Sequence, residues 1–245
     1  MIKTWVSRLV RMAFLTITIF AGYTLLLCVP QAFFSYSVRA EGITVYVDRP
    51  TSDSAAREVL RLSLQKLATS PLYRRNPAAS VYVCNSRWRQ LLFFNKYYGV
   101  AGLSPYPLTT NVFLRDASFE NNRLISPRGV PVPGDRTLDY FVAHEVTHEL
   151  TGRLVGPWRF YQMPQWVREG YADYVGKGAS FNYAVARRSF LAGTFEMDFR
   201  RSGQYRRFHL LVAYLLDHQG WTVDRLLQGP WPDQQHLERE LRAEE

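Results

Sequence analysis

The sequence predicts an α+β protein in which an N-terminal transmembrane helix precedes a small mixed layer of strands and helices packed on a helical core. Three observations predict this class. Residues 12–29 form an uncharged apolar stretch that is long enough for a membrane span. Short β-rich runs such as residues 43–47 alternate with segments of helical periodicity up to about residue 134. The later residues are mainly helical in pattern, and 245 residues fit one domain with an appendage.

The N-terminal segment has the charge pattern of a membrane anchor. Three basic residues and no acidic residue lie in residues 1–11, directly before the apolar stretch. We expect a cytoplasmic basic segment over residues 1–11 and a transmembrane signal anchor over residues 12–34. Because positive charges favour the cytoplasmic side, the rest of the chain is expected to be extracytoplasmic.

Cleavage of the same segment as a signal peptide is the alternative, and it would release a secreted protein. Residues 30–32 read Pro-Gln-Ala, which is a poor cleavage site. Residues 38–40 have better small side chains but lie far from the apolar stretch. An uncleaved anchor is therefore favoured.

One domain is expected over residues 40–245, with a strand-rich part at 40–134, a helical part at 135–220 and a C-terminal tail at 221–245. In the strand-rich part the pattern predicts strands at 43–47, 81–83, 111–115 and 124–125, helices at 52–68 and 87–98, and loops at 99–107 and 126–134.

The helical part contains the pattern H-E-x-x-H at His144, Glu145 and His148. Two side chains four residues apart lie about 40° apart around a helix and about 6 Å apart along it, so both imidazoles project from one face. This spacing suits two nitrogen ligands on one Zn²⁺ ion. Glu145 lies beside the first histidine, where its carboxylate can act as a general base toward a metal-bound water molecule.

A second motif begins at Pro164, which suits the first turn of a new helix. Glu169 and Asp173 then share one face of this helix because they are four residues apart. One carboxylate can complete a metal triad while the other accepts the N–H of a ligating imidazole. The alternative is that both are surface charges on an amphipathic helix.

Residues 166–172 read W-x-x-E-G-x-A, which resembles the second motif of the gluzincins, the thermolysin-like and aminopeptidase-like zinc metallopeptidases of the peptidase MA-like superfamily. The resemblance covers the helical part and is strong over the two motifs alone. It implies a helical zincin core in which His144, His148 and Glu169 bind zinc and Asp173 orients His144. The gap from His148 to Glu169 is close to that of the aminopeptidase branch but not the same.

The resemblance also implies a tyrosine or histidine that hydrogen-bonds the oxyanion of the reaction. Tyr205 and His209 lie four residues apart in a helix predicted over residues 205–218, so both are candidate catalytic residues. Tyr205 fits the resemblance better. A half-buried tyrosine and a solvated histidine without a catalytic role are the alternative.

An edge strand that pairs with an extended peptide substrate is a further feature of the resembled family. Residues 111–114 and residues 124–125 are the two candidates for this strand. The sequence leaves the choice between them open.

The formal net charge of +9 comes from basic residues that are spread over many segments. For an anchored domain this distribution favours attraction to anionic lipid headgroups. The sequence contains no recognisable nucleic-acid-binding module, so we expect no nucleic-acid partner.

The leading hypothesis is a membrane-anchored, zinc-dependent metallopeptidase that hydrolyses peptide or protein substrates through a zinc-bound water activated by Glu145. A zinc-stabilised binding or scaffolding module without catalysis is the second hypothesis, and a membrane protein without a metal is the third. Endopeptidase and exopeptidase action both stay open.

Overall fold

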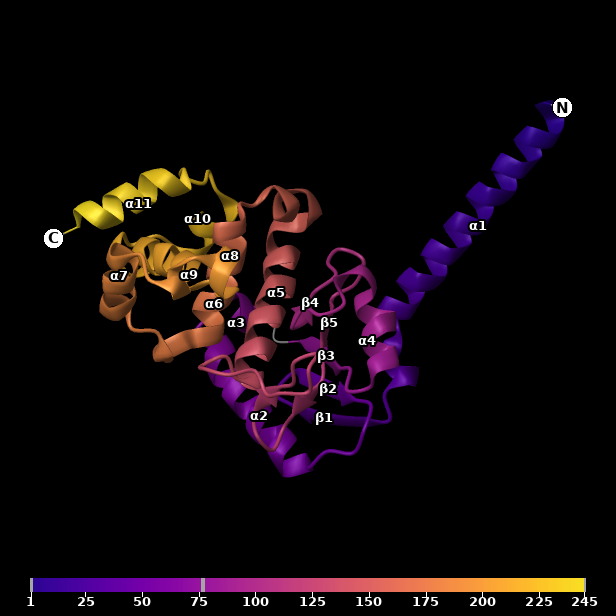
Figure 1. Cartoon of the computed structure of the whole chain (residues 1–245), viewed down its shortest axis with the longest axis horizontal. Helices are drawn as coiled ribbons and strands as arrows, with labels where there is room; N and C mark the ends of the chain where they lie inside the picture. The colour runs from indigo at the N-terminus through magenta and orange to yellow at the C-terminus, as the bar shows by residue number, and fades with distance from the viewer. Residues whose placement is uncertain (1, 76–77, 245) are drawn as a thin grey trace.

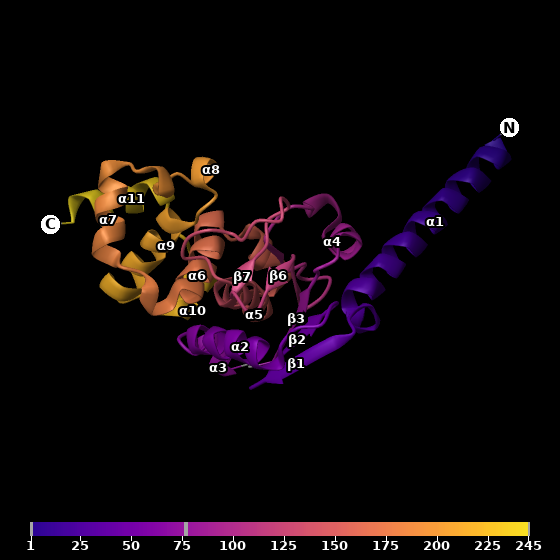
Figure 2. The same ribbon diagram turned by 60° about the horizontal axis from the view of Figure 1, so that its bottom comes forward.

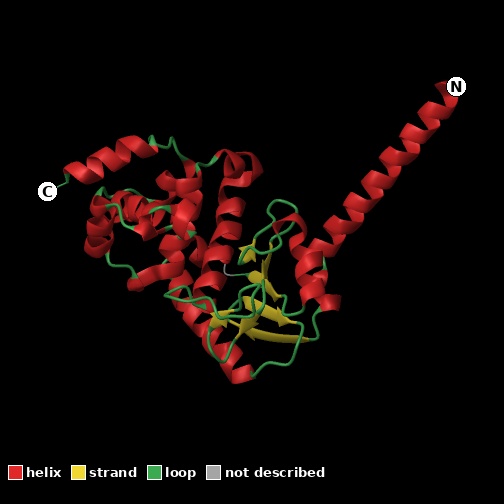
Figure 3. Cartoon of the chain, viewed as in Figure 1, coloured by secondary structure: helices red, strands yellow, loops and turns green. Residues whose placement is uncertain are grey.

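A computed structural model of the chain describes residues 2–75 and 78–244. Helices and strands are mixed in one chain, and the predicted α+β class is confirmed (Figure 3). The order in the chain is an apolar N-terminal helix, a sheet with covering helices, and then a helical C-terminal half (Figure 1).

The N-terminal helix α1 spans Ile2–Cys28 and projects away from the rest of the molecule (Figures 1 and 2). Its segment Arg8–Cys28 is long and apolar enough to cross a membrane by length and composition. Helix α1 ends earlier than the anchor predicted over residues 12–34, because Pro30 begins the short 3-10 helix η1 (Pro30–Phe33). Phe34 is buried in the domain.

The main sheet has five strands in the order β1-β2-β3-β5-β4. The pairs β1–β2 and β4–β5 are antiparallel, whereas β2–β3 and β3–β5 are parallel. A second, two-stranded sheet pairs β6 with β7. The strands are β1 (Tyr36–Ala40), β2 (Ile43–Val47), β3 (Ala79–Val83), β4 (Gly102–Leu103), β5 (Asn111–Leu114), β6 (Ala117–Ser118) and β7 (Arg123–Leu124).

Three of these strands differ from the sequence prediction. β1 and β6 were not expected as strands, and β4 lies in the segment 99–107 that was predicted to be a loop. Each is placed by main-chain pairing with a neighbouring strand, β1 with β2, β4 with β5 and β6 with β7. A two-residue strand carries no periodic signal in its own sequence.

The helices after α1 cover both faces of the sheet and build the C-terminal half. In Figure 1, α4 lies beside the base of α1, while α6 to α11 lie on the other side of α5. The helices are α2 (Asp53–Leu67), α3 (Pro71–Arg75), α4 (Arg87–Phe94), α5 (Leu138–Gln162), α6 (Gln165–Lys177), α7 (Tyr183–Ala192), α8 (Phe199–Ser202), α9 (Arg206–Ala213), α10 (Val223–Gln228) and α11 (Gln234–Ala243), with short η2 (Asn95–Tyr97), η3 (Gly178–Ser180), η4 (Phe195–Met197) and the π-turn η5 (Tyr214–His218).

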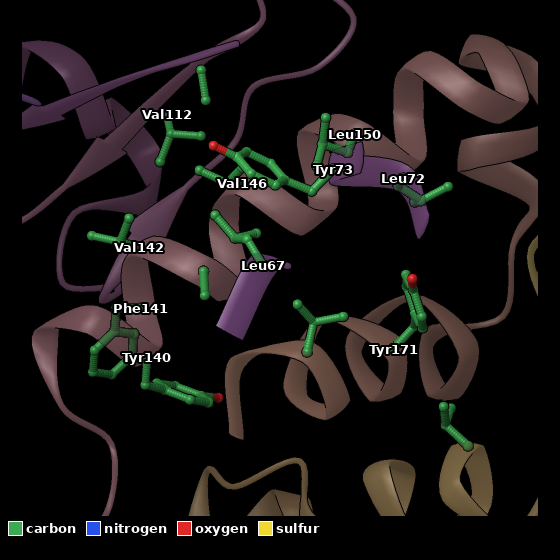
Figure 4. Close-up of a cluster of buried hydrophobic side chains, with 14 of the residues drawn as sticks. Leu67, Leu72, Tyr73, Val112, Tyr140, Phe141, Val142, Val146, Leu150 and Tyr171 are labelled. Atoms are coloured by element: carbon green, nitrogen blue, oxygen red, sulfur yellow. The ribbon is translucent and has the colours of Figure 1, made fainter. Parts of the chain in front are cut away.

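Alternate residues of the strands feed two hydrophobic cores on opposite faces of the sheet. Val81 and Val112 point into the larger core, which lies between the sheet and helices α2, α5 and α6 (Figure 4). Tyr82 and Phe113 point the other way, into a smaller core that also contains Leu27 of α1. The sheet therefore joins the central helix α5 on one face to the end of α1 on the other.

Candidate metal centre

Helix α5 carries the H-E-x-x-H pattern through the middle of the molecule. It is buried from Leu138 to Gly152, and its first turn is held by Asn122, whose side-chain oxygen accepts from the Asp139 backbone N–H (3.1 Å). Gly156 interrupts the helix with a φ of 76°, a conformation that favours glycine. The interruption comes after the motif, so the motif itself lies on regular helix.

The helical spacing brings both imidazoles to one point, as predicted. His144 Nε2 and His148 Nε2 are 3.2 Å apart. Glu169 Oε2 of α6 lies 3.6 Å from His144 Nε2 and 3.3 Å from His148 Nε2. The ligand atoms of the three residues all lie within 4.8 Å of one another, so this group could hold a metal ion.

Glycines in α6 allow the close helix contacts that position Glu169. A Cβ on Gly170 would lie 2.6 Å from the carbonyl oxygen of Phe208 in α9. A Cβ on Gly176 would lie 3.0 Å from the ring of Tyr140 in α5. Helix α6 is therefore packed closely against α9 directly beside the glutamate, and against α5 about two turns further on.

The resemblance implies that Asp173 orients His144, but the contacts of Asp173 are with Tyr140 and His209. Its Oδ1 accepts from the hydroxyl of Tyr140 (2.5 Å) and its Oδ2 is 2.9 Å from His209 Nδ1. The Tyr140 hydroxyl is in turn 3.4 Å from His144 Nδ1. Asp173 is thus linked to His144 through the Tyr140 hydroxyl, which contacts both side chains.

The three carboxylates of the centre have shifted pKa values with different causes. Burial raises the pKa of Glu145 to about 7, with His144 opposing the rise and Glu169 adding to it. Burial also acts to raise the pKa of Glu169, but His148 and His144 outweigh it and hold that pKa well below its usual range. Asp173 is likewise buried, yet its pKa falls to about 2 because of His209.

The centre faces a cavity of about 690 Å³. Glu145 lines this cavity and lies against the edge strand β4. A Cβ on Gly102 would lie 2.5 Å from Glu145 Oε1, so a larger residue at this position of β4 would force the carboxylate to shift. The other lining residues from the centre are His144, His148, Glu169 and Tyr205.

The two candidate oxyanion residues take separate positions. Tyr205 lines the cavity, and its ring stacks on His144 at 5.7 Å between centroids with 9° between the planes. Burial and the nearby Glu169 raise the pKa of Tyr205 well above its usual value, so the hydroxyl keeps its proton. His209 is buried behind the centre, stacked on Phe181 at 3.5 Å, and is not among the residues that line the cavity. His209 thus lies on the side of Asp173, whereas Tyr205 lies in the cavity wall.

Sequence reasoning missed Tyr140, Gly102 and the strand that carries Gly102. Tyr140 had an available signal, because it lies four residues before His144 and so shares its face of the helix. Gly102 had none, since its contact with Glu145 joins residues 43 positions apart (145 − 102 = 43).

Neither candidate strand for a substrate edge lies at the free edge of the main sheet. β5 is interior, between β3 and β4, and β7 belongs to the small second sheet. The terminal strand beside the metal centre is β4.

No protein-family model matches the chain, and no match is found among curated proteins. The geometry of the centre is therefore the basis for assigning a function.

Proposed function

We propose that the chain is a membrane-anchored, zinc-dependent peptidase of the gluzincin type. The observation that carries this proposal is the meeting of His144, His148 and Glu169 at a cavity whose wall also contains a buried general-base candidate, Glu145. All four side chains come from the two motifs, and the cavity is large enough for a short peptide segment.

Two imidazole nitrogens and one carboxylate oxygen form the usual protein donor set of a catalytic zinc ion, which keeps a further position open. His144, His148 and Glu169 would hold the ion. Bound there, Zn²⁺ would supply a Lewis acid and lower the pKa of a water molecule toward neutrality. Tyr140 would fix the orientation of the His144 ring, because its hydroxyl meets Nδ1.

Glu145 would take a proton from the attacking water and pass it to the nitrogen of the leaving amine. Its carboxyl group lines the cavity together with His144 and His148, so it can act on both the attacking water and the leaving amine. Tyr205 keeps its hydroxyl protonated and would donate a hydrogen bond to the oxyanion that develops on the carbonyl oxygen.

Strand β4 would bind the substrate backbone. One edge of β4 pairs with β5, and its other edge has no strand partner in the described part of the chain. An extended peptide that pairs with this edge would pass Glu145, because Gly102 contacts that carboxylate. Main-chain pairing of this kind tolerates many side chains and would suit an endopeptidase or an exopeptidase.

The anchor would place the domain outside the cytoplasm. Helix α1 has the length for a span, and the basic residues in segment 1–11 favour a cytoplasmic N-terminus.

The test is Glu145→Gln in the purified protein, with a mixed peptide library as substrate. We expect one zinc ion per chain in both proteins, because Glu145 is not a ligand. We also expect hydrolysis to fall about 100-fold or more in the variant, since general-base catalysis is lost. Mass spectrometry of the products reports activity and cleavage position together.

If wild type and Glu145→Gln bind zinc equally and are equally inert, the peptidase assignment fails and the zinc-stabilised binding module takes its place. If protein purified without chelator contains no zinc, both of these assignments fail.

A further inference from the structure

The end of α1 is built into the domain. Asn111 Nδ2 donates to the carbonyl oxygens of Leu27 (2.8 Å) and Cys28 (3.1 Å). The hydroxyl of Tyr23 donates to the carbonyl oxygen of Phe93 (3.3 Å), and Leu27 is buried. The orientation of the domain on its apolar helix is therefore set by packing and not by a flexible linker.

The same end of α1 forms part of the wall of the cavity at the metal centre. Tyr23 and Leu27 line the cavity that is also lined by Glu145 and Glu169. The apolar helix and the candidate reaction centre thus share one continuous space.

The length of α1 limits how far this cavity can lie from a bilayer. The uncharged stretch covers residues 12–29, which is 18 residues (29 − 12 + 1 = 18) and includes Tyr23 and Leu27. In a helix it spans about 27 Å, whereas the hydrocarbon core of a bilayer is about 30 Å thick. The stretch is thus no longer than the hydrocarbon core is thick. When it spans a bilayer, the residues packed on its last two turns, at Tyr23 and Leu27, lie at the boundary between the hydrocarbon core and the headgroups.

The surface beside this helix end has the composition of a membrane interface. We call the exposed apolar side chains of α4, η2 and the following loop the rim of the cavity; they are Trp88, Leu91, Tyr97, Tyr98, Val100 and Leu108. Tryptophan and tyrosine favour the headgroup region. Residues 86–115 contain four basic residues and no acidic residue, which suits anionic lipids. In both views α4 lies at the base of α1 (Figures 1 and 2).

We infer that the cavity opens directly at the membrane surface, with the rim seated among the headgroups, and that the substrate is the segment of another membrane-anchored protein that lies immediately outside the bilayer. This inference rests on the peptidase function proposed above and names its substrate class. A substrate chain that leaves the bilayer next to α1 can reach Glu145 along β4 directly. A cleavage site that its own chain holds far from the membrane cannot enter the cavity.

Two matched substrates test the inference with the full chain in vesicles that contain anionic lipid. Both carry the same cleavable segment on the same transmembrane anchor. In one substrate the segment follows the anchor directly, and in the other a rigid helical spacer of about 20 residues raises it by about 30 Å. Both are confined to the same membrane, so their local concentrations match. We expect the proximal segment to be cleaved at least about tenfold faster, because only it can adopt the bound geometry.

A pair of variants distinguishes a role of the rim in membrane contact from a role in catalysis. Trp88→Ser with Leu91→Ser removes two rim side chains that do not line the cavity. Phe195→Ser with Leu191→Ser is the matched control on the C-terminal half, at two similarly exposed positions. The rim variant should lose several-fold in cleavage of the proximal substrate and keep its hydrolysis of a short soluble peptide, while the control variant should keep both.

A fluorescence measurement that does not depend on catalysis tests whether the rim contacts the membrane. An environment-sensitive fluorophore on Leu91→Cys should be quenched by spin-labelled lipid, and the same fluorophore on Leu191→Cys should not be. Equal cleavage of the proximal and raised segments, or equal quenching at the two positions, overturns the inference while soluble-peptide hydrolysis still supports a peptidase. Absence of hydrolysis of every substrate overturns the peptidase function and, with it, the substrate class.

Discussion

Tyr140 links Asp173 to His144, two residues that the resemblance implies to be in direct contact. Its hydroxyl contacts Asp173 Oδ1 and His144 Nδ1, so the orientation of the first histidine depends on a side chain outside both motifs. His209 holds the other oxygen of the same carboxylate. The chain Asp173–Tyr140–His144 is thus a buried support for the metal centre.

Tyr140→Phe should weaken zinc binding. The substitution removes the hydroxyl that orients His144, and the loss of such a supporting contact typically lowers metal affinity about 10- to 100-fold. Competition with a chromophoric chelator measures the affinity. Tyr171→Phe is the control, because it removes another buried hydroxyl, paired with Ser70 Oγ at 2.8 Å, away from the centre. Equal zinc affinity in the two variants would contradict the supporting role.

Gly102→Ala should separate catalysis from metal binding. The added Cβ would lie 2.5 Å from Glu145 Oε1, so the carboxylate or strand β4 must move. We expect kcat to fall about tenfold or more while the zinc content is unchanged, because a small displacement of a general base is costly. Wild-type turnover in this variant would show that β4 does not position Glu145.

Glu145 should make the zinc-free protein less stable as the pH rises. Burial raises its pKa from 4.5 to about 7, so between these values the folded state keeps a proton that the unfolded state has lost. The contribution of this group to the free energy of unfolding therefore falls as the pH rises from 4.5 to 7. Glu145→Gln should be more stable than wild type by on the order of 1–3 kcal/mol above pH 7 and similar to it near pH 4.5.

Urea unfolding of both proteins across this pH range, with chelator present, measures the difference. A constant difference between wild type and variant at all pH values would show that the carboxyl group is not held protonated by the fold.

At the scale of elements, the contact of α6 with α5 and α9 decides where Glu169 lies. The helix presents Gly170 to the backbone of α9 and Gly176 to Tyr140 of α5. A larger residue at Gly170 would have to displace the α9 backbone, and one at Gly176 would press on the ring of Tyr140. The second motif therefore contributes helix packing as well as the carboxylate of the His-His-Glu group.

Gly170→Ala should test this contact. The Cβ would lie 2.6 Å from Phe208 O, so α6 and α9 must separate. We expect a loss of about 1–3 kcal/mol in the free energy of unfolding, together with weaker zinc binding as Glu169 shifts. Gly22→Ala in α1 is the control, because nothing lies within 4 Å of its added Cβ. A stable Gly170→Ala protein with wild-type zinc affinity would show that the helices can adjust around the new methyl group.

At the scale of the whole molecule, the sheet couples the apolar helix to the metal centre. Its larger core packs against α5, and its smaller core packs against Leu27 of α1. β4 at the edge contacts Glu145 through Gly102. The end of the apolar helix, the sheet and the candidate centre are consequently parts of one packed unit.

Zinc should stabilise this whole unit because its ligands come from two helices. A ligand that binds only the folded state at 100 times its Kd adds about 2.7 kcal/mol to the free energy of unfolding. Thermal unfolding with zinc and with chelator measures this gain. His148→Ala should show no such gain, since a ligand is missing, and a gain equal to that of wild type would place the metal elsewhere.

The sequence by itself determined the features that depend on local spacing. The i, i+4 periodicity of a helix puts His144 and His148 on one face, and their approach to Glu169 agrees with the prediction from the second motif. The apolar run that becomes α1 and the alternating pattern of β2 were also predicted. Both patterns can be recognised within one continuous stretch of sequence.

Only the tertiary structure decided which groups surround the metal centre. The two-residue strand β4 is formed by pairing with β5, and Gly102 leaves the space in which Glu145 lies against it. Packing turns His209 toward Asp173 and away from the cavity, and it brings Tyr23 of α1 into the cavity wall. These contacts join residues tens of positions apart, and the spacing of side chains along one element carries no information about them.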